Sequence, residues 1–273
     1  MPLYQVKGGQ KFRGIRYKPL NYLKTFHDDR YTHTNRAIIT GYGGGKTYAV
    51  CMENILVSAL NPGVPNIIIE PTFQMVKDIL EPTIINILDD NGFRYTYNKS
   101  EKNFYLPEVD GYIWLRSGDK PEKLKGMNAG LVTIDEPFIQ DVDTYKVAIS
   151  RSRHPKAKVR GIILSGTPET LNWGKDLIER PEEHFKVYSG TTYDNHHLEP
   201  DYVEKLRASY GERSSGLCFR KVRELHGGSC LLLFHAGEYY PELHTGSFVT
   251  SGSFMRLQYR SYELDDWSGN RRC

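Results

Sequence analysis

A glycine-rich segment that ends in lysine and threonine is the part of this sequence whose residue types most clearly predict chemistry. The segment consists of Thr40, Gly41, Tyr42, Gly43, Gly44, Gly45, Lys46 and Thr47. Glycines let the backbone curl so that successive N–H groups face one anion, and a helix that starts there adds the positive end of its dipole. In such a loop Lys46 would reach the β- and γ-phosphates of a nucleotide, and the Thr47 hydroxyl would ligate Mg²⁺.

The match to the phosphate-loop pattern is incomplete, because that pattern begins with glycine where this chain has Thr40. A glycine-rich turn before a helix also occurs as a merely tight connection. The strand expected before the segment and the helix expected after it favour the phosphate-binding interpretation. We therefore expect ATP to contact Gly41, Tyr42, Gly43, Gly44, Gly45, Lys46 and Thr47.

Two adjacent carboxylates, Asp135 and Glu136, follow the apolar run 131–134. Neighbouring residues on a strand point to opposite faces, so the two acids are expected to have different roles. We expect Asp135 to hold Mg²⁺ through its water shell beside Thr47, and Glu136 to polarise the attacking water as a general base. Acids at a strand end also occur as a solvated cap, but their combination with Lys46 favours catalysis.

A third apolar run, 162–164, is followed by Ser165, Gly166 and Thr167. Small hydroxyl residues on the strand beside an acidic strand can sense the γ-phosphate in nucleotide motors. Because serine, glycine and threonine are also common turn formers, an ordinary strand-to-turn junction is the alternative. These three residues are nonetheless candidates for nucleotide binding.

The elements that position these residues alternate between strands and helices. Continuous apolar runs predict strands at 37–40, 66–70, 131–134 and 161–164. Helical patterns are expected at 19–27, 46–60, 73–90 and from about 141, and aromatic alternation at 94–116 predicts a β-hairpin excursion. The fold class is therefore α/β, with a mainly parallel central sheet flanked by helices. Ligands of such sheets bind at the carboxyl ends of the strands, where every motif described above lies.

The amino-acid composition indicates the general class of protein but points to no further chemical activity. The chain has 273 residues, of which 39% are hydrophobic and 25% charged, as in ordinary soluble proteins. There is no run of apolar residues long enough for a transmembrane helix and no secretory signal, so we expect a cytoplasmic protein with no membrane association. The net charge is +3, but residues 1–212 hold 28 basic against 27 acidic residues. A DNA track would therefore have to be a local basic patch.

Taken together, the three strand-end motifs resemble the additional-strand ATPases, which include superfamily 2 helicases and phage large terminases. Two further segments favour terminases. One is 115–126, with a serine and a Leu-basic-Gly element ahead of the Asp-Glu pair. The other is Thr191 to Asn195, followed by Leu198 and a helix-like stretch, 202–210, that ends before Gly211. The resemblance covers about residues 15–212, and the Thr-Tyr-Asp-Asn stretch is its most distinguishing part.

The resemblance implies a RecA-like P-loop NTPase fold that hydrolyses ATP with Mg²⁺. It further implies that hydrolysis powers translocation of double-stranded viral DNA into a procapsid, in the host cytoplasm. The partners it implies are double-stranded DNA, the portal protein, the small terminase subunit and further copies of the chain in a ring.

Two departures from the family pattern affect nucleotide recognition. Many terminases have arginine in the phosphate loop where this chain has Tyr42, and the glutamine that reads adenine would fall near Leu23. The arginine that neutralises charge on the transferred phosphoryl group must then come from elsewhere, either from this chain or from a neighbouring subunit. The candidates, each of which is otherwise a solvated surface charge, are Arg116, Lys125, Arg151 and Arg153.

The segment 213–273 is expected to be an atypical tail after a motor domain of residues 1–212. A large terminase normally continues into a nuclease domain, which roughly sixty residues cannot form, so nuclease activity is not expected and Asp265 and Asp266 are treated as surface charges. Possible codons for residues 230–234, when read one base out of frame, encode a short amino-acid sequence that resembles the start of that nuclease domain. A frameshift near residue 213, or another truncation, would explain a poorly ordered ending. A set that could form a zinc site, Cys218, His226, Cys230 and His235, matches no common zinc spacing, so these cysteines, Cys51 and Cys273 are expected to be free thiols.

Two other functions use the same motifs. A superfamily 2 helicase-like translocase shares the catalytic residues but requires a second RecA-like domain, for which the chain has no room. A nucleotide-dependent switch protein would bind ATP without sustained turnover, and the Asp135 and Glu136 pair argues against it.

Overall fold

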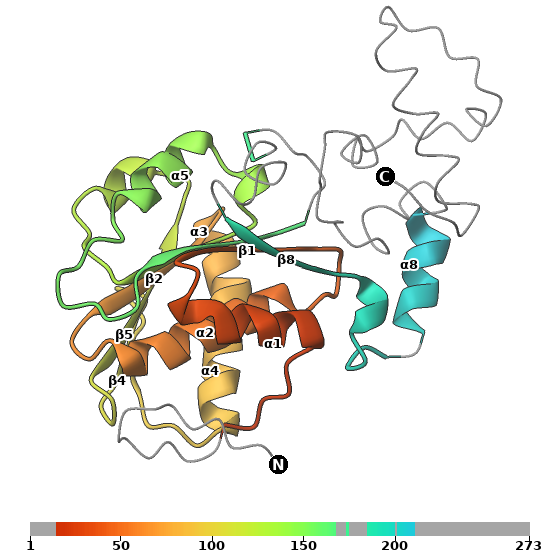
Figure 1. Ribbon diagram of the computed structural model, residues 1–273, viewed down its shortest axis with the longest axis horizontal. Helices are drawn as coiled ribbons and strands as arrows, with labels where there is room; N and C mark the ends of the chain where they lie inside the picture. The colour runs from red at the N-terminus through yellow and green to blue at the C-terminus, as the bar shows by residue number, and fades with distance from the viewer. Residues whose placement is uncertain (1–14, 168–172, 175–184, 200, 211–273) are drawn as a thin grey trace, which may run out of the picture.

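Parallel strands with apolar residues on both faces form the centre of the protein (Figure 1). The computed structural model describes residues 15–167, 173–174, 185–199 and 201–210. The eight strands have the order β3-β4-β5-β2-β6-β7-β1-β8, and all pairings from β5 to β8 are parallel. The predictions made for residues 213–273, including three of the four cysteines, concern residues outside these ranges.

The predicted α/β class is confirmed, and the four expected parallel strands are present. They are β1 (Asn35–Thr40), β2 (Pro65–Glu70), β6 (Leu131–Asp135) and β7 (Gly161–Gly166). A further strand, β8 (Lys186–Gly190), was not predicted and pairs with β1 at the lateral edge of the sheet. An edge strand is less completely covered than a central one, so β8 lacks the continuous apolar run by which the other four strands were recognised.

The segment expected to form a β-hairpin forms three strands instead. They are β3 (Thr96–Asn98), β4 (Asn103–Leu106) and β5 (Gly111–Ser117). The first two are antiparallel, and β5 pairs antiparallel with β4 on one side and parallel with β2 on the other. The hairpin excursion therefore continues the central sheet.

Helices connect and cover the strands. They are α1 (Asn21–Asp28), α2 (Lys46–Leu60), α3 (Phe73–Met75), α4 (Glu81–Asp90), α5 (Val142–Ile149) and α8 (Tyr202–Tyr210). The single helix expected at 73–90 is interrupted by a π-helical turn, Val76–Leu80, just before Pro82. Proline has no N–H to donate and crowds the preceding turn, so a wider turn there is the physical reason. No helix in the described ranges is long and apolar enough to cross a membrane.

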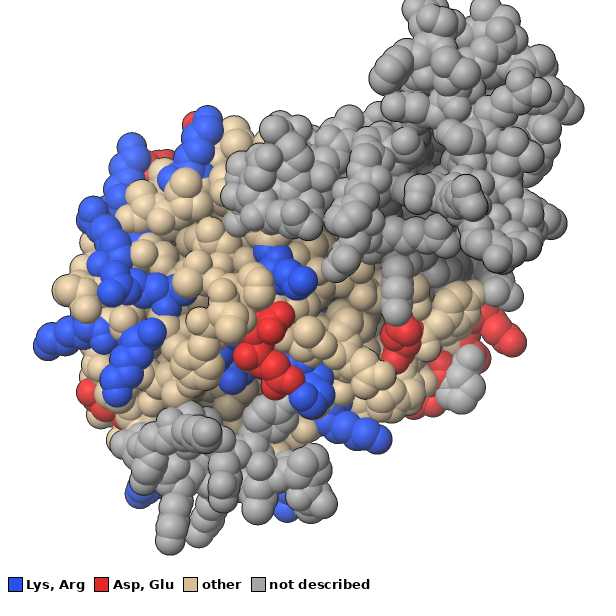
Figure 2. All heavy atoms as spheres, in the orientation of Figure 1, with Lys and Arg blue, Asp and Glu red and all other residues tan. Residues whose placement is uncertain are grey.

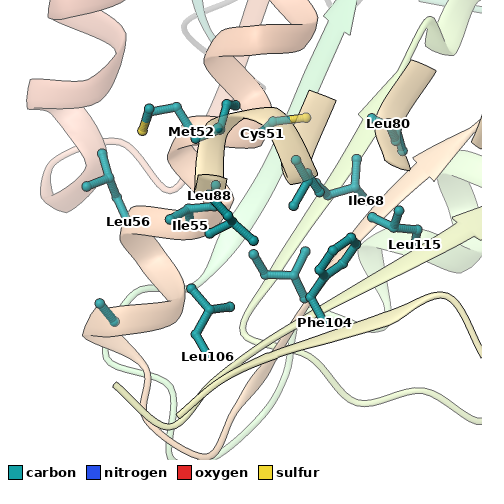
Figure 3. Close-up of a cluster of buried hydrophobic side chains, with 14 of the residues drawn as sticks. Cys51, Met52, Ile55, Leu56, Ile68, Leu80, Leu88, Phe104, Leu106 and Leu115 are labelled. Atoms are coloured by element: carbon teal, nitrogen blue, oxygen red, sulfur yellow. The ribbon is translucent and has the colours of Figure 1, made fainter. Parts of the chain in front are cut away.

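Alternate residues of each central strand pack on opposite faces of the sheet. Ile67, Ile69, Val132 and Ile134 belong to the apolar cluster that includes Ala148 of α5. Ile68 belongs to the cluster formed with α2 and α4, part of which is shown in Figure 3. In Figure 1, α5 lies on one side of the sheet and α1, α2 and α4 lie on the other. The sheet is therefore the middle of three layers, and alternation along each strand decides which layer a side chain faces.

A buried ionic cluster ties α1 to α2 and β1. The carboxylate of Glu53, which is 0% exposed, accepts hydrogen bonds from Arg30 and Arg36, and its Oε2 lies 2.6 Å from His27 Nδ1. Although burial opposes ionisation, Arg36, Arg30 and His27 hold the pKa of Glu53 well below its usual range. Burial lowers the pKa of His27, and the two guanidinium groups supply fixed positive charge to the cluster. Glu53, in the middle of α2, therefore has fixed positive partners.

We predict that Glu53→Gln destabilises the protein by about 3–5 kcal/mol, because removal of one partner leaves buried positive charge uncompensated. The measurement is the free energy of unfolding in urea at pH 7. Because the folded-state pKa of Glu53 is lowered, its contribution is present above the unfolded value of 4.5 and is lost as the pH falls below it. The difference between wild type and variant should narrow in acid.

The matched control is Lys146→Gln, which removes an exposed pair with Asp143 on α5. That pair is solvated, so its loss should cost less than about 1 kcal/mol. Equal losses in the two variants would contradict the structural role given to Glu53.

Candidate phosphate and metal site

The loop between β1 and α2 has the backbone conformation of an anion-binding turn. Gly43 and Gly45 have φ values of 68° and 78°, which L side chains rarely adopt. A Cβ at Gly44 would collide with the Thr40 side chain, so this position also requires glycine. α2 starts at Lys46, and Gly45 at its N-cap offers no side chain to the first N–H groups. These groups and the helix dipole are therefore directed at the space above the loop, where a phosphate fits.

Lys46 lies beneath this loop and is only 7% exposed. Its Nζ donates to Thr167 Oγ1 at 2.8 Å and to the carbonyl oxygens of Thr40 and Gly41 at 3.3 and 3.2 Å. It also lies 3.8 Å from Glu136 Oε1. Burial lowers the pKa of Lys46, and the nearby carboxylates of Glu136 and Asp135 partly oppose that shift. The ammonium group therefore lies between the phosphate loop and the acids.

Asp135 and Thr47 are joined directly, although 88 positions separate them in the chain: Thr47 Oγ1 donates to Asp135 Oδ2 at 2.9 Å. Asp135 is buried at the end of β6, and its second oxygen, Oδ1, has no partner at hydrogen-bond geometry in the described part of the chain, although the Ser165 hydroxyl lies near enough to lower the pKa of this carboxyl group. Burial raises the pKa of Asp135. A hydroxyl and a carboxylate with a free oxygen are the ligands that Mg²⁺ accepts beside nucleotide phosphates, so these residues fit the metal that the sequence predicts.

Glu136 does not follow the strand alternation that the sequence analysis assumed. β6 ends at Asp135, and Glu136 has φ 44° and ψ 55°, a left-handed conformation that is uncommon for residues other than glycine. This turn brings its carboxylate to the same side as Lys46 instead of the opposite face. Glu136 also accepts a hydrogen bond from the Thr167 N–H at 3.0 Å. Burial raises its pKa.

The three residues that follow the apolar run of β7 divide into two kinds. Thr167 contacts both Lys46 and Glu136, at the place expected of a residue that senses a terminal phosphate. Ser165 is buried in register with Asp135. Gly166 packs against Pro137 and Phe138, where a Cβ would be crowded. The nucleotide contacts expected of these residues stay predictions, although Thr167 lies within the site.

Three residues that the sequence analysis did not assign to the site hold the carbonyl groups of the phosphate loop. Thr192 donates to Tyr42 O at 2.7 Å, Asn195 Nδ2 donates to Gly43 O at 2.6 Å, and Tyr22 donates to Gly44 O. Thr192 and Asn195 belong to the stretch that most distinguishes the family resemblance, which was the available signal. Tyr22 had no such signal. These contacts fix three carbonyl groups of the loop and thereby the backbone on which an anion would bind.

Arg116 and Arg153 do not reach the phosphate loop of their own chain. Arg116 lies on β5, which β2, β6 and β7 separate from β1, and its guanidinium donates to Glu101 O, Asn103 Oδ1 and Leu115 O. The Arg153 N–H donates a hydrogen bond to the carbonyl of Ala129. Ala129 precedes β6, so it lies at the amino ends of the parallel strands, opposite the phosphate loop. Neither residue is therefore placed to stabilise charge at the loop of its own chain. A role in a neighbouring subunit's site stays a prediction.

Among the described residues, no three His, Cys, Asp or Glu side chains form a dedicated metal cage. Mg²⁺ in nucleotide sites typically binds one or two protein ligands, phosphate oxygens and water, so Thr47 and Asp135 suffice. The arrangement can bind a triphosphate, hold the metal beside it and place a carboxylate where water would attack.

Comparison with known proteins identifies relatives of the chain. The family model described as "Terminase large subunit, T4likevirus-type, N-terminal" matches residues 37–226. The PBSX phage terminase large subunit of Bacillus subtilis (strain 168) is 24% identical over 202 residues, which are 68% of this chain and 46% of that protein.

Solved structures show the same fold at low sequence identity. The large terminase of a thermophilic bacteriophage matches with a TM-score of 0.66 and 12% identity, over 74% of this chain and 53% of that one. The complex of the same terminase with ATP-gamma-S matches with a TM-score of 0.62 and 14% identity, over 74% and 52%. The large terminase ATPase domain of Thermus phage P74-26 has a TM-score of 0.54 and 17% identity, over 74% and 89%. The chain spans about half the length of the PBSX protein and of the first of these terminases.

We predict that Thr192→Val weakens binding of a fluorescent nucleoside triphosphate by about 3- to 10-fold, the equivalent of one hydrogen bond. The change removes the donor to Tyr42 O while preserving the shape of the side chain. The control is Thr83→Val, which removes a hydrogen bond from α4 to Ile79 O in the preceding π-helical turn and should leave the affinity unchanged. Wild-type affinity in Thr192→Val would show that the loop does not depend on this contact.

Proposed function

This chain belongs to the family of T4likevirus-type terminase large subunits, of which it contains the N-terminal part, and we propose that it is the ATP-hydrolysing motor domain that drives double-stranded viral DNA into a procapsid. The observation that supports this most directly is the convergence of Lys46, Thr47, Asp135 and Glu136 at one edge of the sheet. The thermophilic-bacteriophage terminase, which has the same fold, binds ATP-gamma-S.

The residues divide the work of phosphoryl transfer among them. The loop N–H groups and Lys46 bind the β- and γ-phosphates, and Thr47 and Asp135 hold Mg²⁺, which neutralises phosphate charge when bound. Glu136 orients a water molecule toward the γ-phosphorus and accepts its proton. Thr167 contacts both Lys46 and Glu136, so it can respond when the terminal phosphate leaves.

The charge that develops on the transferred phosphoryl group needs a further cation. Within this chain, Arg116 and Arg153 lie too far from the loop, so we propose that a neighbouring copy in a ring supplies an arginine. In this proposal the ring binds the portal protein and the small terminase subunit in the host cytoplasm, and the procapsid receives the DNA.

A basic strip provides the surface for the DNA. It consists of Lys120, Lys123, Lys125, Lys146, Arg151, Arg153, Lys156, Lys158 and Arg160. All of these are exposed except Arg151, which is partly buried and whose guanidinium donates to Lys125 O, so that the two loops lie together. Between residues 150 and 160 there are five basic residues and no acidic ones. Figure 2 shows Lys and Arg gathered on the side where α5 lies in Figure 1.

The strip fits the phosphate backbone of DNA better than a specific base sequence. Exposed ammonium and guanidinium groups on flexible stems neutralise phosphates and release counterions whatever the sequence is. A motor that moves along viral DNA needs this kind of contact. Because residues 1–212 are nearly neutral overall, DNA binding would need a local basic patch, and the strip is such a patch.

We predict that Glu136→Gln lowers ATP turnover by at least about 100-fold while binding of Mg²⁺ and ATP is retained, because the variant removes only the general base. The measurements are phosphate release and equilibrium nucleotide binding. Equal turnover in wild type and variant would show that Glu136 is not the base. Binding without turnover in wild type would favour the switch protein over the motor.

We predict that the triple variant Lys156→Gln, Lys158→Gln, Arg160→Gln weakens duplex DNA binding and leaves DNA-independent ATP turnover unchanged. Removal of three phosphate contacts should reduce the slope of log affinity against log salt by about 2.7. A fluorescence anisotropy titration at several salt concentrations measures both quantities.

The matched control removes the same charge elsewhere, with Lys24→Gln, Lys77→Gln and Lys99→Gln, all of which are exposed. An equal loss in the control would mean that binding follows net charge, and an unchanged slope in the triple variant would exclude the strip as the DNA surface.

A further inference from the structure

Glu70, the last residue of β2, is a buried acid to which the mechanism above gives no role. It is 0% exposed, and no donor within the described part of the chain reaches either of its carboxylate oxygens, whose polar neighbour is the carboxyl group of Asp135. In the sequence it reads simply as the end of an apolar strand. Burial of a carboxyl group without compensation is costly, so its retention there calls for a physical reason.

The register of the sheet places Glu70 beside Asp135. β2 and β6 are parallel neighbours in which Ile69 pairs with Ile134, so the next residues, Glu70 and Asp135, lie at the same level. Ile68 packs against α2, and Glu70, two residues further, faces the same layer. Asp135 faces that layer as well, since it bonds Thr47 at the start of α2. Glu70 is therefore aimed at the metal side of the candidate site.

A second buried acid, Glu53, provides a comparison, because the fold supplies it with cationic partners. Glu53 is also 0% exposed, but two arginines and a histidine contact its carboxylate. No described cation contacts Glu70, and burial together with the carboxylates of Asp135 and Glu136 raises its pKa to about 9. The core thus provides fixed partners for one acid and leaves the other directed into the site.

We propose that Glu70 is an outer-sphere carboxylate of the metal site, which accepts hydrogen bonds from water molecules bound to Mg²⁺ and so fixes the metal on Asp135. This inference rests on the proposed nucleotide-hydrolysing function. Mg²⁺ gives up its water reluctantly, and second-shell carboxylates orient such ligands. A role through water also agrees with the lack of a three-residue metal cage among the described residues.

Glu70 and Glu136 would then act on opposite sides of Asp135. Glu136 lies toward β7, where it contacts Lys46 and Thr167. Glu70 lies on β2, on the other flank of β6. One acid serves the attacking water and the other serves the water shell of the metal.

The test measures the Mg²⁺ concentration at which a non-hydrolysable fluorescent ATP analogue is half-bound, so that turnover plays no part. Glu70→Gln keeps the size of the side chain but removes the carboxyl group, which can ionise when a cation binds beside it. The midpoint should rise by about 10- to 100-fold, the usual effect of removing an outer-shell partner, while binding in EDTA stays at the wild-type level. Thr47→Ala, which removes a direct ligand, is the positive control.

A second variant distinguishes the loss of the carboxyl group from a loss of folding. Glu70→Asp keeps the carboxylate on a shorter arm and should give a midpoint between wild type and Glu70→Gln, with melting temperature recorded for each variant. A Glu70→Gln midpoint within about twofold of wild type overturns the inference, as does an equal loss of affinity with and without Mg²⁺. If wild type itself fails to bind the analogue at any Mg²⁺ concentration, the proposed function fails and not the assignment of Glu70.

Discussion

The hydrogen bond from Thr47 to Asp135 is the contact on which the rest of the site depends. It joins the start of α2 to the end of β6 across the sheet, and it aligns the phosphate loop with the acids. Parallel strands make this contact possible because their carboxyl ends lie at one edge. If β6 were displaced by one residue in its register, every side chain on it would change faces and Asp135 would point away from α2. The chemistry therefore depends on strand register more than on any loop.

The sequence predicted the central part of this arrangement because the signals there are local. Continuous apolar runs identified β1, β2, β6 and β7, and each motif followed its strand directly. A glycine-rich turn before a helix and a pair of acids after a buried strand can be recognised without knowing the sheet order. Lys46, Thr47, Asp135 and Glu136 were accordingly placed together before any contact between them was known.

Features that depend on sheet order or on distant contacts could not be predicted in this way. Arg116 and Arg153 have the right chemical type, but their distance from the loop follows from where β5 and the amino edge of β6 lie. Thr192 and Asn195 were recognised as a distinguishing stretch, yet their bonds to the loop carbonyls require β8 beside β1. The position of Glu70 beside Asp135 could not be predicted, because it follows from the pairing of β2 with β6. The left-handed turn at Glu136 had no sequence signal either, because glutamate is not a residue that favours this conformation.

Buried acids among the described residues of this protein are of two kinds, those with cationic partners in the fold and those at the candidate site without them. The fold supplies Arg30 and Arg36 to Glu53, which stabilises a junction between α1, α2 and β1. At the carboxyl ends of the strands it does the reverse, because Glu70 and Asp135 Oδ1 are buried with no donor at hydrogen-bond geometry among the described residues. Such atoms lower the stability of the chain unless a bound cation and its water satisfy them. The same low dielectric that makes them costly strengthens their attraction for a metal. Binding of nucleotide and Mg²⁺ would therefore stabilise this edge of the sheet, so the occupancy of the site and the rigidity of the strands that form it are physically linked.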